Sequence, residues 1–499
     1  MKVIVGRIKS FCTSAEFEFL LAISTVFAIL RIPSLVEPDW YGDEGIYQVI
    51  GMALKQGRFL YREIWDNKPP MLYLIYSVVN GDLFYTRLLS LISGIISVIF
   101  IFFLAKKLFK KRISIYLSTT IFAILFSLPL IEGNIANAEN FMLAPIILSA
   151  LLILSNKSIN YFLAGLLLSF AFLTKIVAVF DFAAFFIVIF ILRVYDNFSI
   201  KRIYNYFQSF LKNKKIIFNF KDEMFFAVSF VFPIILVFVF FTIKGAFNDF
   251  YTATFSQNVG YVGYGNYFIF PMGRLILKLI LLFLVILIVI IFRSKLGKNG
   301  FFIFIWLMFS LFNCLFSERP YTHYMLVLLP SFCLFIGYLI ENKKLLILNS
   351  FILVLLLVII LRSFNLYAKI FPYYSNYINF IINNKSAASY EAFFDRNTPR
   401  DYLVAEFIKA NTNPDDYIFL WSDSGQIYKL SNKLPPGRYI VSYHITFYKD
   451  GISETKNAID KFRPKYIIAT KQINPIYYLL RNYGYKLSIK NASVYERQF

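Results

Sequence analysis

The sequence predicts an α-helical polytopic membrane protein of about eleven spans that ends in a small α/β domain. Of its 499 residues, 58% are hydrophobic and only 16% are charged, and the mean hydropathy is +0.62. Soluble domains usually carry about 25% charged residues. Apolar runs of about 18 or more residues recur along most of the chain, which is typical of membrane spans. The tail after residue 365 is more polar and alternates strand and helix patterns.

The spans are read from the apolar runs, and two of them are short for a bilayer. We expect them near 17–36, 83–105, 113–131, 140–154, 160–174, 177–194, 224–243, 273–292, 301–316, 324–340 and 345–365. The N-terminal segment MKVIVGRIKSFCTSAEFEF leads into a full span without a small-residue cleavage site, so no cleavable signal is predicted.

The charge distribution predicts the orientation. If the N-terminus lies inside, the inner segments hold 21 lysines and arginines and the outer short loops hold nine. Basic residues favour the cytoplasmic side, so this bias predicts a multi-pass protein of the cytoplasmic (plasma) membrane with its N-terminus inside. The net charge of +22 is then explained by basic cytoplasmic loops, and we expect no nucleic-acid partner.

An odd number of spans places the tail outside. We therefore expect a transmembrane domain over residues 1–365 and an extracytoplasmic α/β domain over residues 366–499, long enough to bury its own core. Helices are predicted at Pro399–Asn411, after a Thr398 cap, and at Glu454–Phe462. Strands are predicted at Tyr417–Trp421, Tyr439–Tyr443, Tyr466–Ala469 and Tyr485–Ile489. Three cysteines, Cys12, Cys314 and Cys333, share no metal-ligand spacing and form no disulfide framework.

The first outer loop, YGDEGIYQVIGMALKQGRFLYREIWDNKPP over residues 41–70, is the most informative segment. Residues 42–56 have the pattern of an amphipathic helix lying on the membrane, with Asp43 and Glu44 at its start. Lys68 precedes two prolines, which fix it on a rigid turn. A reaction site would use these charges, but the acids could also only complement the helix dipole, and Lys68 could be an interfacial lysine.

The other outer segments bring further charged residues to the same side. Glu139 opens a hydrophobic helix, where dipole complementation is the alternative to function. Lys175 lies between two spans and is either a turn residue or a ligand-binding cation; an ion pair with it would explain Asp181 inside the next span. Further candidates are Arg274 and Lys278, which share one helix face, and Arg319 and His323 in SERPYTHYM. A structural role is an alternative for His323, and it is the role expected for His444. The aromatic segment 245–271 could close as a lid.

At these residues the chain resembles the GT-C superfamily of polytopic glycosyltransferases, in the branch of protein O-mannosyltransferases and bacterial lipid A aminoarabinose transferases. The motifs that carry the resemblance are DEGIYQVIGMALKQGRFLYREIWDNKPPMLYL, TRLLSLISG, NAENFMLAPIIL, AGLLLSFAFLTK and RPYTHYMLVLLP, with NPDDYIFLWSDSGQIYKLS and PPGRYI in the tail. The tail differs from the β-trefoil domain of eukaryotic protein mannosyltransferases.

The resemblance implies an inverting glycosyltransferase that moves a sugar from a polyprenyl-phosphate donor to a cell-envelope acceptor, a lipid, a glycan or a protein. It implies that Asp43 is the general base with Glu44 as its neighbour, that Glu139 lies near the acceptor or an optional divalent cation shared with Asp43, and that Lys68 and Lys175 bind the donor phosphate. Arg274, Lys278, Arg319 and His323 are expected to assist them, Arg319 and His323 matching only loosely. A transporter or flippase for a lipid-linked sugar and a membrane scaffold are the alternatives.

Overall fold

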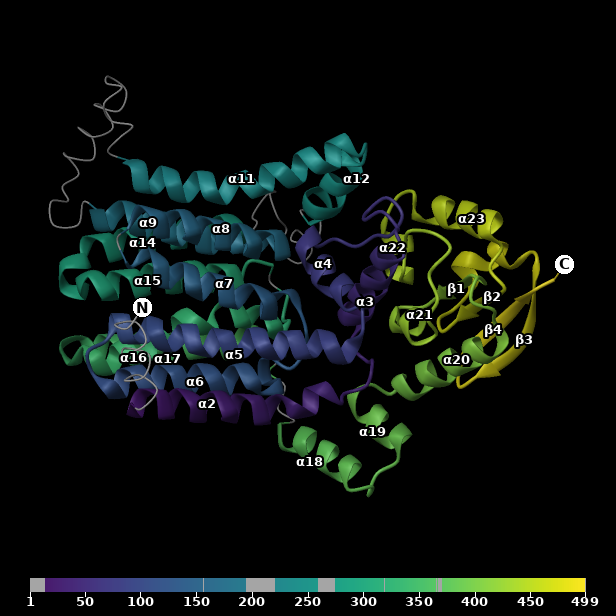
Figure 1. The fold of residues 1–499 in the computed structure, drawn as a ribbon, viewed down its shortest axis with the longest axis horizontal. Helices are drawn as coiled ribbons and strands as arrows, with labels where there is room; N and C mark the ends of the chain where they lie inside the picture. Colours follow the sequence, from purple (N-terminus) through teal and green to yellow (C-terminus); the bar gives the residue numbers. More distant parts are fainter. Residues whose placement is uncertain are drawn as a thin grey trace, which may run out of the picture.

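Within the described residues, eleven helices form a bundle, and each coincides with one of the predicted spans. The computed structural model describes residues 14–155, 157–193, 220–258, 274–317, 319–364, 366 and 370–498. The bundle helices run side by side (Figure 1) and are α2 (Ala15–Arg31), α5 (Leu83–Leu108), α6 (Arg112–Ser127), α7 (Ala138–Ile153), α8 (Ser158–Thr174), α9 (Val179–Arg193), α11 (Lys221–Ile243), α14 (Arg274–Ile291), α15 (Arg293–Cys314), α16 (Leu329–Glu341) and α17 (Leu346–Ser363).

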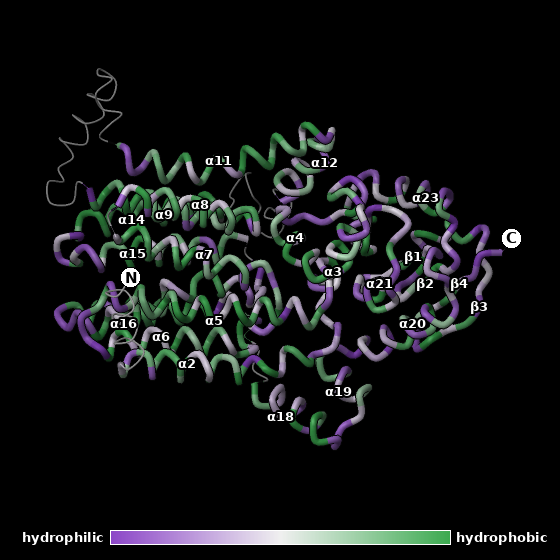
Figure 2. Tube along the Cα trace, viewed as in Figure 1, coloured by the Kyte–Doolittle hydropathy of each residue, from purple (hydrophilic) through white to green (hydrophobic). Residues whose placement is uncertain are grey.

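Hydropathy along the bundle has the profile of a membrane domain. Hydrophobic residues fill the middle of the bundle and hydrophilic residues gather toward its ends (Figure 2). Within the described segments, six helical spans are long and apolar enough to cross a bilayer, and α6, α7, α8, α14 and α16 are shorter apolar helices. Small residues let the helices approach closely: a Cβ on Gly165 of α8 would lie 2.0 Å from Ser229 Oγ of α11.

The first loop folds into α3 (Gly42–Lys55) and α4 (Pro70–Val78) at one end of the bundle, next to the C-terminal region (Figure 1). The predicted helix over residues 42–56 is confirmed as α3, and its place on the membrane surface stays a prediction. Residues 44–53 of α3 are all buried, because α4 and the C-terminal region pack against the helix. A Cβ on Gly45 would lie 2.8 Å from the backbone nitrogen of Gln426, so glycine allows this close packing.

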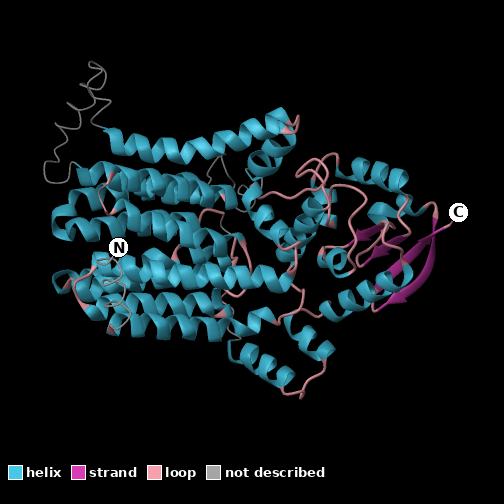
Figure 3. Ribbon diagram, viewed as in Figure 1, coloured by secondary structure: helices cyan, strands magenta, loops and turns pink. Residues whose placement is uncertain are grey.

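In the part of the chain that the structure describes, all of the strands lie in the C-terminal region (Figure 3). Its four-stranded sheet has the order β1-β2-β4-β3, with β1 and β2 parallel and the other two pairs antiparallel. The strands are β1 (Ile418–Trp421), β2 (Tyr466–Ala469), β3 (Tyr483–Ile489) and β4 (Ala492–Arg497); the helices are α18 (Ile370–Ile381), α19 (Ala387–Phe394), α20 (Thr398–Asn411), α21 (Gln426–Leu430), α22 (Ser442–Phe447) and α23 (Gly451–Phe462).

Two predictions for this region need correction, and one strand was missed. The segment Tyr439–Tyr443 is not a strand: Tyr439 to Val441 are buried and irregular, and α22 begins at Ser442. This apolar run is buried by packing rather than by strand pairing. The strand β4 was not predicted, because its residues ASVYER mix charged with apolar side chains. The predicted cap of α20 also differs, since Asn397 occupies the cap position and makes no side-chain capping bond.

Candidate functional site

A cavity of about 570 Å³ lies where the bundle end, the first loop and the C-terminal region meet. Six segments far apart in the sequence contribute its walls, so only the folded chain brings these residues together. Its polar and charged lining residues are Tyr41, Asp43, Tyr47, Asp66, Asn67, Lys68, Asn137, Glu139, Lys175, Gln257, Asn258, Asn313, Ser317, Arg319, Tyr321, His323, Tyr324, Tyr443, His444 and Tyr448. Of the predicted site residues, Asp43, Glu139, Lys68, Lys175, Arg319 and His323 lie here.

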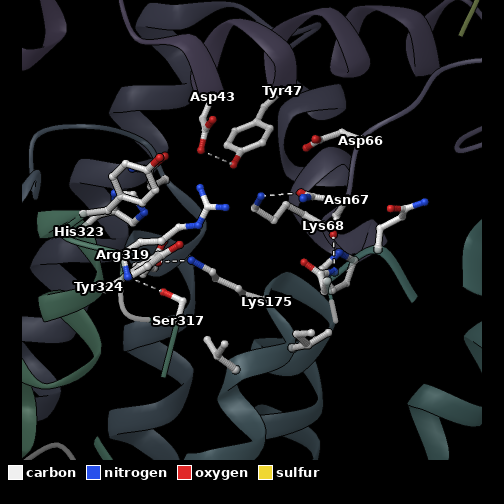
Figure 4. A pocket seen from close by; sticks show the side chains of 18 of the residues that line it. Asp43, Tyr47, Asp66, Asn67, Lys68, Lys175, Ser317, Arg319, His323 and Tyr324 are labelled. Atoms are coloured by element: carbon white, nitrogen blue, oxygen red, sulfur yellow. Dashed lines mark hydrogen bonds and ion pairs between the residues drawn. The ribbon is translucent and has the colours of Figure 1, made fainter. Parts of the chain in front are cut away.

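Asp43 faces the cavity from the first turn of α3 (Figure 4). The hydroxyl of Tyr47, one turn later, donates to Asp43 Oδ2 at 3.3 Å. Burial, followed by the negative charge of Asp43, raises the pKa of Tyr47 well above its usual value, so this phenol stays a donor. Asp43 is therefore a half-buried carboxylate that is oriented by one hydrogen bond and open to the cavity.

Glu44 points away from the cavity, because adjacent residues on a helix face in different directions. Its carboxylate makes two bonds to Arg87, from Nη2 at 2.6 Å and from Nε at 3.1 Å. It also accepts the backbone N–H of Ala136 at 2.8 Å. Glu37 lies 3.3 Å from Arg87 on the other side, and all three side chains are buried. Glu44 thus sits in an ion-pair network that fastens α3 to α5, outside the cavity.

Two hydrogen bonds of its backbone groups fix the position of Lys68 at the cavity. Its N–H donates to Tyr73 Oη at 2.9 Å, and its carbonyl accepts from Tyr61 Oη at 2.7 Å. Tyr61 is fully buried with φ of 67°, an uncommon conformation for a tyrosine. The lysine ammonium reaches the cavity, where it donates to Asn67 Oδ1 at 2.6 Å (Figure 4). Such backbone strain is often found at functional sites.

Lys175 and Glu139 meet as a buried ion pair. The lysine Nζ contacts Glu139 Oε1, and the side chains are 12% and 2% exposed. The same ammonium lies 4.7 Å from the ring centroid of Tyr324, a cation–π contact. The prediction that Lys175 pairs with Asp181 is wrong: Asp181 accepts instead from Trp306 Nε1 at 2.8 Å.

Arg319 and His323 reach the cavity from the loop before α16, and both are labelled in Figure 4. His323 Nδ1 lies 2.9 Å from Glu132 Oε2, which also accepts from Tyr41 Oη at 2.6 Å. Burial tends to raise the pKa of Glu132, but the hydrogen bonds and charge around it, His323 first, lower that pKa to about 2. His323 is therefore engaged by a carboxylate, whereas the Arg319 guanidinium is directed toward the centre of the cavity.

Two predicted cations lie elsewhere. Lys278 donates to the Leu315 carbonyl at 2.5 Å and does not line the cavity. Arg274 begins α14, and its side chain lies outside the described residues. The predicted lid over 245–271 is described only as far as Asn258, whose amide donates to the Asn67 carbonyl at 3.0 Å.

Two cavity residues were missed as site candidates. Asp66 immediately precedes Asn67 in the first loop, and its place in the polar run DNK was the available signal. His444 lies on α22 and was assigned a structural role in a strand. For a metal, Asp43 and Glu139 share the cavity, but Glu139 is already paired with Lys175. The described part of the chain holds no group of three or more His, Cys, Asp or Glu side chains arranged for a metal ion.

Comparisons with known proteins agree with this architecture. Residues 67–211 match the family model described as dolichyl-phosphate-mannose-protein mannosyltransferase. No curated protein matches the chain by sequence. The solved structure of ArnT from Cupriavidus metallidurans bound to undecaprenyl phosphate is similar over 97% of this chain and 98% of that chain, with 13% identity and a TM-score of 0.52.

The archaeal oligosaccharyltransferase AglB from Archaeoglobus fulgidus, solved with an inhibitory peptide and a dolichol-phosphate, is similar over 94% of this chain and 71% of that chain. Its identity is 12% and its TM-score is 0.48. The chain therefore shares with ArnT the fold of a helical bundle with a small C-terminal sheet, and its residues 67–211 are similar to the mannosyltransferase family model.

Proposed function

We propose that this protein is an inverting glycosyltransferase that takes a sugar from a polyprenyl-phosphate donor and transfers it to a cell-envelope acceptor. The observation that carries the proposal is the cavity at one end of the apolar bundle, where Lys68, Lys175 and Arg319 lie opposite Asp43 (Figure 4). The family match over residues 67–211 supports the choice of donor. The structure of ArnT, which has the same fold, holds undecaprenyl phosphate.

The three cations suit a phosphate leaving group. Charge-assisted hydrogen bonds from Lys and Arg to phosphate oxygens are among the stronger polar contacts in proteins. Cations that are already in position when the reaction begins stabilise the negative charge that grows on the phosphate as its bond to the sugar breaks. The ammonium of Lys175 forms an ion pair with Glu139 in this structure. We propose that it turns from this carboxylate toward the phosphate when the donor binds.

Asp43 suits the role of general base. In the proposed step, the acceptor hydroxyl oxygen attacks the anomeric carbon, its proton passes to Asp43, and the carbon–oxygen bond to the lipid phosphate breaks. The hydrogen bond from Tyr47 orients the carboxylate, and a single base is enough for one inverting displacement. Glu139 would lie on the acceptor side and keep Lys175 in place. A divalent cation between Asp43 and Glu139 stays a prediction.

The arrangement in the membrane follows from the charge bias. We propose that the N-terminus is cytoplasmic, that the transmembrane catalytic domain spans residues 1–365, and that the extracytoplasmic domain spans residues 366–499. The reaction then takes place at the outer face of the plasma membrane, with a lipid, a glycan or a protein as acceptor. Transporters bind their substrates near the bilayer midplane, and the position of this cavity at the bundle end disfavours a flippase.

The proposal is tested by incubating the purified protein in nanodiscs with a panel of radiolabelled polyprenyl-phosphate sugars and a total envelope extract. Transfer of label by the wild type, and at least tenfold slower transfer by Lys68→Met, supports the proposal. Glu63→Gln, an exposed site in the same loop, is the matched control and should transfer at the wild-type rate. If the wild type consumes none of the donors, the glycosyltransferase proposal is refuted.

A further inference from the structure

Asp66 and His444 line the cavity and have no role in the proposed reaction. Asp66 lies two residues before Lys68, and His444 comes from α22 in the C-terminal region. Their side chains are only 5% and 7% exposed. Two buried ionisable groups from segments nearly 380 residues apart therefore meet at the wall of one cavity.

The hydrogen bonding of this pair is incomplete. Asp66 Oδ2 accepts from Tyr73 Oη at 2.6 Å. Asp66 Oδ1 lies 3.7 Å from His444 Nε2, which is too long for a direct hydrogen bond. The other ring nitrogen, Nδ1, is buried and has no hydrogen-bond partner among the described residues. Buried polar atoms are almost always satisfied, so this imidazole lacks hydrogen bonds that it would normally make. A ligand in the cavity that bridges His444 Nε2 and Asp66 Oδ1 would add one.

The charge state of the pair selects the kind of ligand. Burial lowers the pKa of His444, and Lys68 acts in the same direction, although Asp66 and Asp43 oppose it. A neutral imidazole offers one donor and one acceptor, and the carboxylate offers acceptors only. This combination fits a hydroxyl group, which both donates and accepts. It does not fit a phosphate, which the carboxylate would repel.

We infer that Asp66 and His444 form a subsite that binds a hydroxyl group of a sugar ring, and that the C-terminal region thereby takes part in substrate selection. This inference rests on the proposed function, since it places the ring beside the phosphate held by Lys68. The hydroxyl belongs either to the sugar of the donor or to the acceptor. Both sources share the same chemistry, and the test separates them.

The test compares His444→Leu and Asp66→Asn with the wild type in two binding measurements. The first probe is undecaprenyl phosphate alone, and the second is the same lipid phosphate carrying mannose, glucose or galactose, whichever the wild type binds most tightly. We expect unchanged affinity for undecaprenyl phosphate. The affinity for the sugar-bearing lipid should fall about tenfold, the effect of losing one hydrogen bond. His444→Gln should restore part of the loss, because its amide also donates and accepts.

If the sugar belongs to the acceptor, the affinity for the donor stays unchanged, and the Michaelis constant for an envelope-extract acceptor rises about tenfold instead. Thr446→Ala, on an exposed position of the same helix, is the matched control and should change neither quantity. The inference is overturned if both variants equal the wild type in donor affinity and acceptor Michaelis constant. A wild type that does not bind undecaprenyl phosphate would instead refute the proposed function.

Discussion

Replacing Lys175 with methionine should weaken folding and donor binding at once, and its ion pair with Glu139 allows the two effects to be separated. Both side chains are largely buried. Removing one partner of a buried ion pair leaves an unpaired charge and typically costs about 3–5 kcal/mol. Lys175→Met should therefore lower the free energy of unfolding by about this amount. The double variant Lys175→Met/Glu139→Gln leaves no charge unpaired and should recover most of the loss.

Donor binding should respond differently. A hydrogen bond to a charged group contributes about 1.5–3 kcal/mol, so loss of Lys175 should weaken binding of undecaprenyl phosphate roughly 10- to 150-fold. The double variant should keep this defect although its folding is restored. In the single variant Glu139→Gln, no carboxylate neutralises the charge of Lys175. This variant should therefore bind the lipid phosphate at least as tightly as the wild type.

The measurements are thermal unfolding in detergent and equilibrium binding of undecaprenyl phosphate for all four proteins. Comparing the double variant with the wild type removes the stability effect from the comparison. If the double variant is stable and binds undecaprenyl phosphate as the wild type does, Lys175 does not contact the donor phosphate and the reasoning fails.

Three further predictions use other parts of the structure. Glu44→Gln should lower the free energy of unfolding by about 1–3 kcal/mol, because it weakens the buried hydrogen bonds to Arg87. Turnover per folded molecule should stay within twofold of the wild type. A turnover loss as large as that of Asp43→Asn would contradict the structural role. The folded-state pKa of Glu132, about 2 against an ordinary 4.5, means that its stabilisation is present above pH 4.5 and is lost as the pH falls toward 2. The melting temperature of Glu132→Gln should therefore lie below that of the wild type at pH 6 and approach it at pH 3, and a gap that does not narrow would count against this. Gly45→Ala should destabilise the junction with the C-terminal region by about 1–3 kcal/mol, because its Cβ would meet the backbone of Gln426. Gly42→Ala on the same helix has open space around its Cβ and should be neutral. Limited proteolysis that cannot distinguish the two variants would refute this packing argument.

The bundle could be predicted because membrane spans are encoded locally. An apolar run of sufficient length needs no distant partner to be recognised, and each of the eleven predicted runs is a helix in the structure. The sheet was predicted less completely. The strands β1 and β2 are continuous buried apolar runs, whereas β4 is a mixed segment whose pairing with β2 and β3 depends on residues distant in sequence.

The site depended more on distant contacts. Asp43 and Glu44 were read as one acidic pair, and only the packing of α3 against α5 shows which of them faces the cavity. Asp181 was assigned a nearby lysine, but its partner Trp306 is 125 residues away. His444 was missed because its helix follows an apolar run that resembles a strand. Local patterns could supply the candidate residues, but not the directions in which their side chains point.

The most direct test of the central claim is a single-turnover assay of Asp43→Asn with the radiolabelled donor that the wild type uses. The amide keeps the size of the side chain and an acceptor for Tyr47, but it cannot take up a proton at neutral pH. We predict undiminished donor affinity with transfer slowed by a factor of about 100 or more, the usual scale of general-base catalysis. Transfer at the wild-type rate would contradict the assignment of Asp43 as the base.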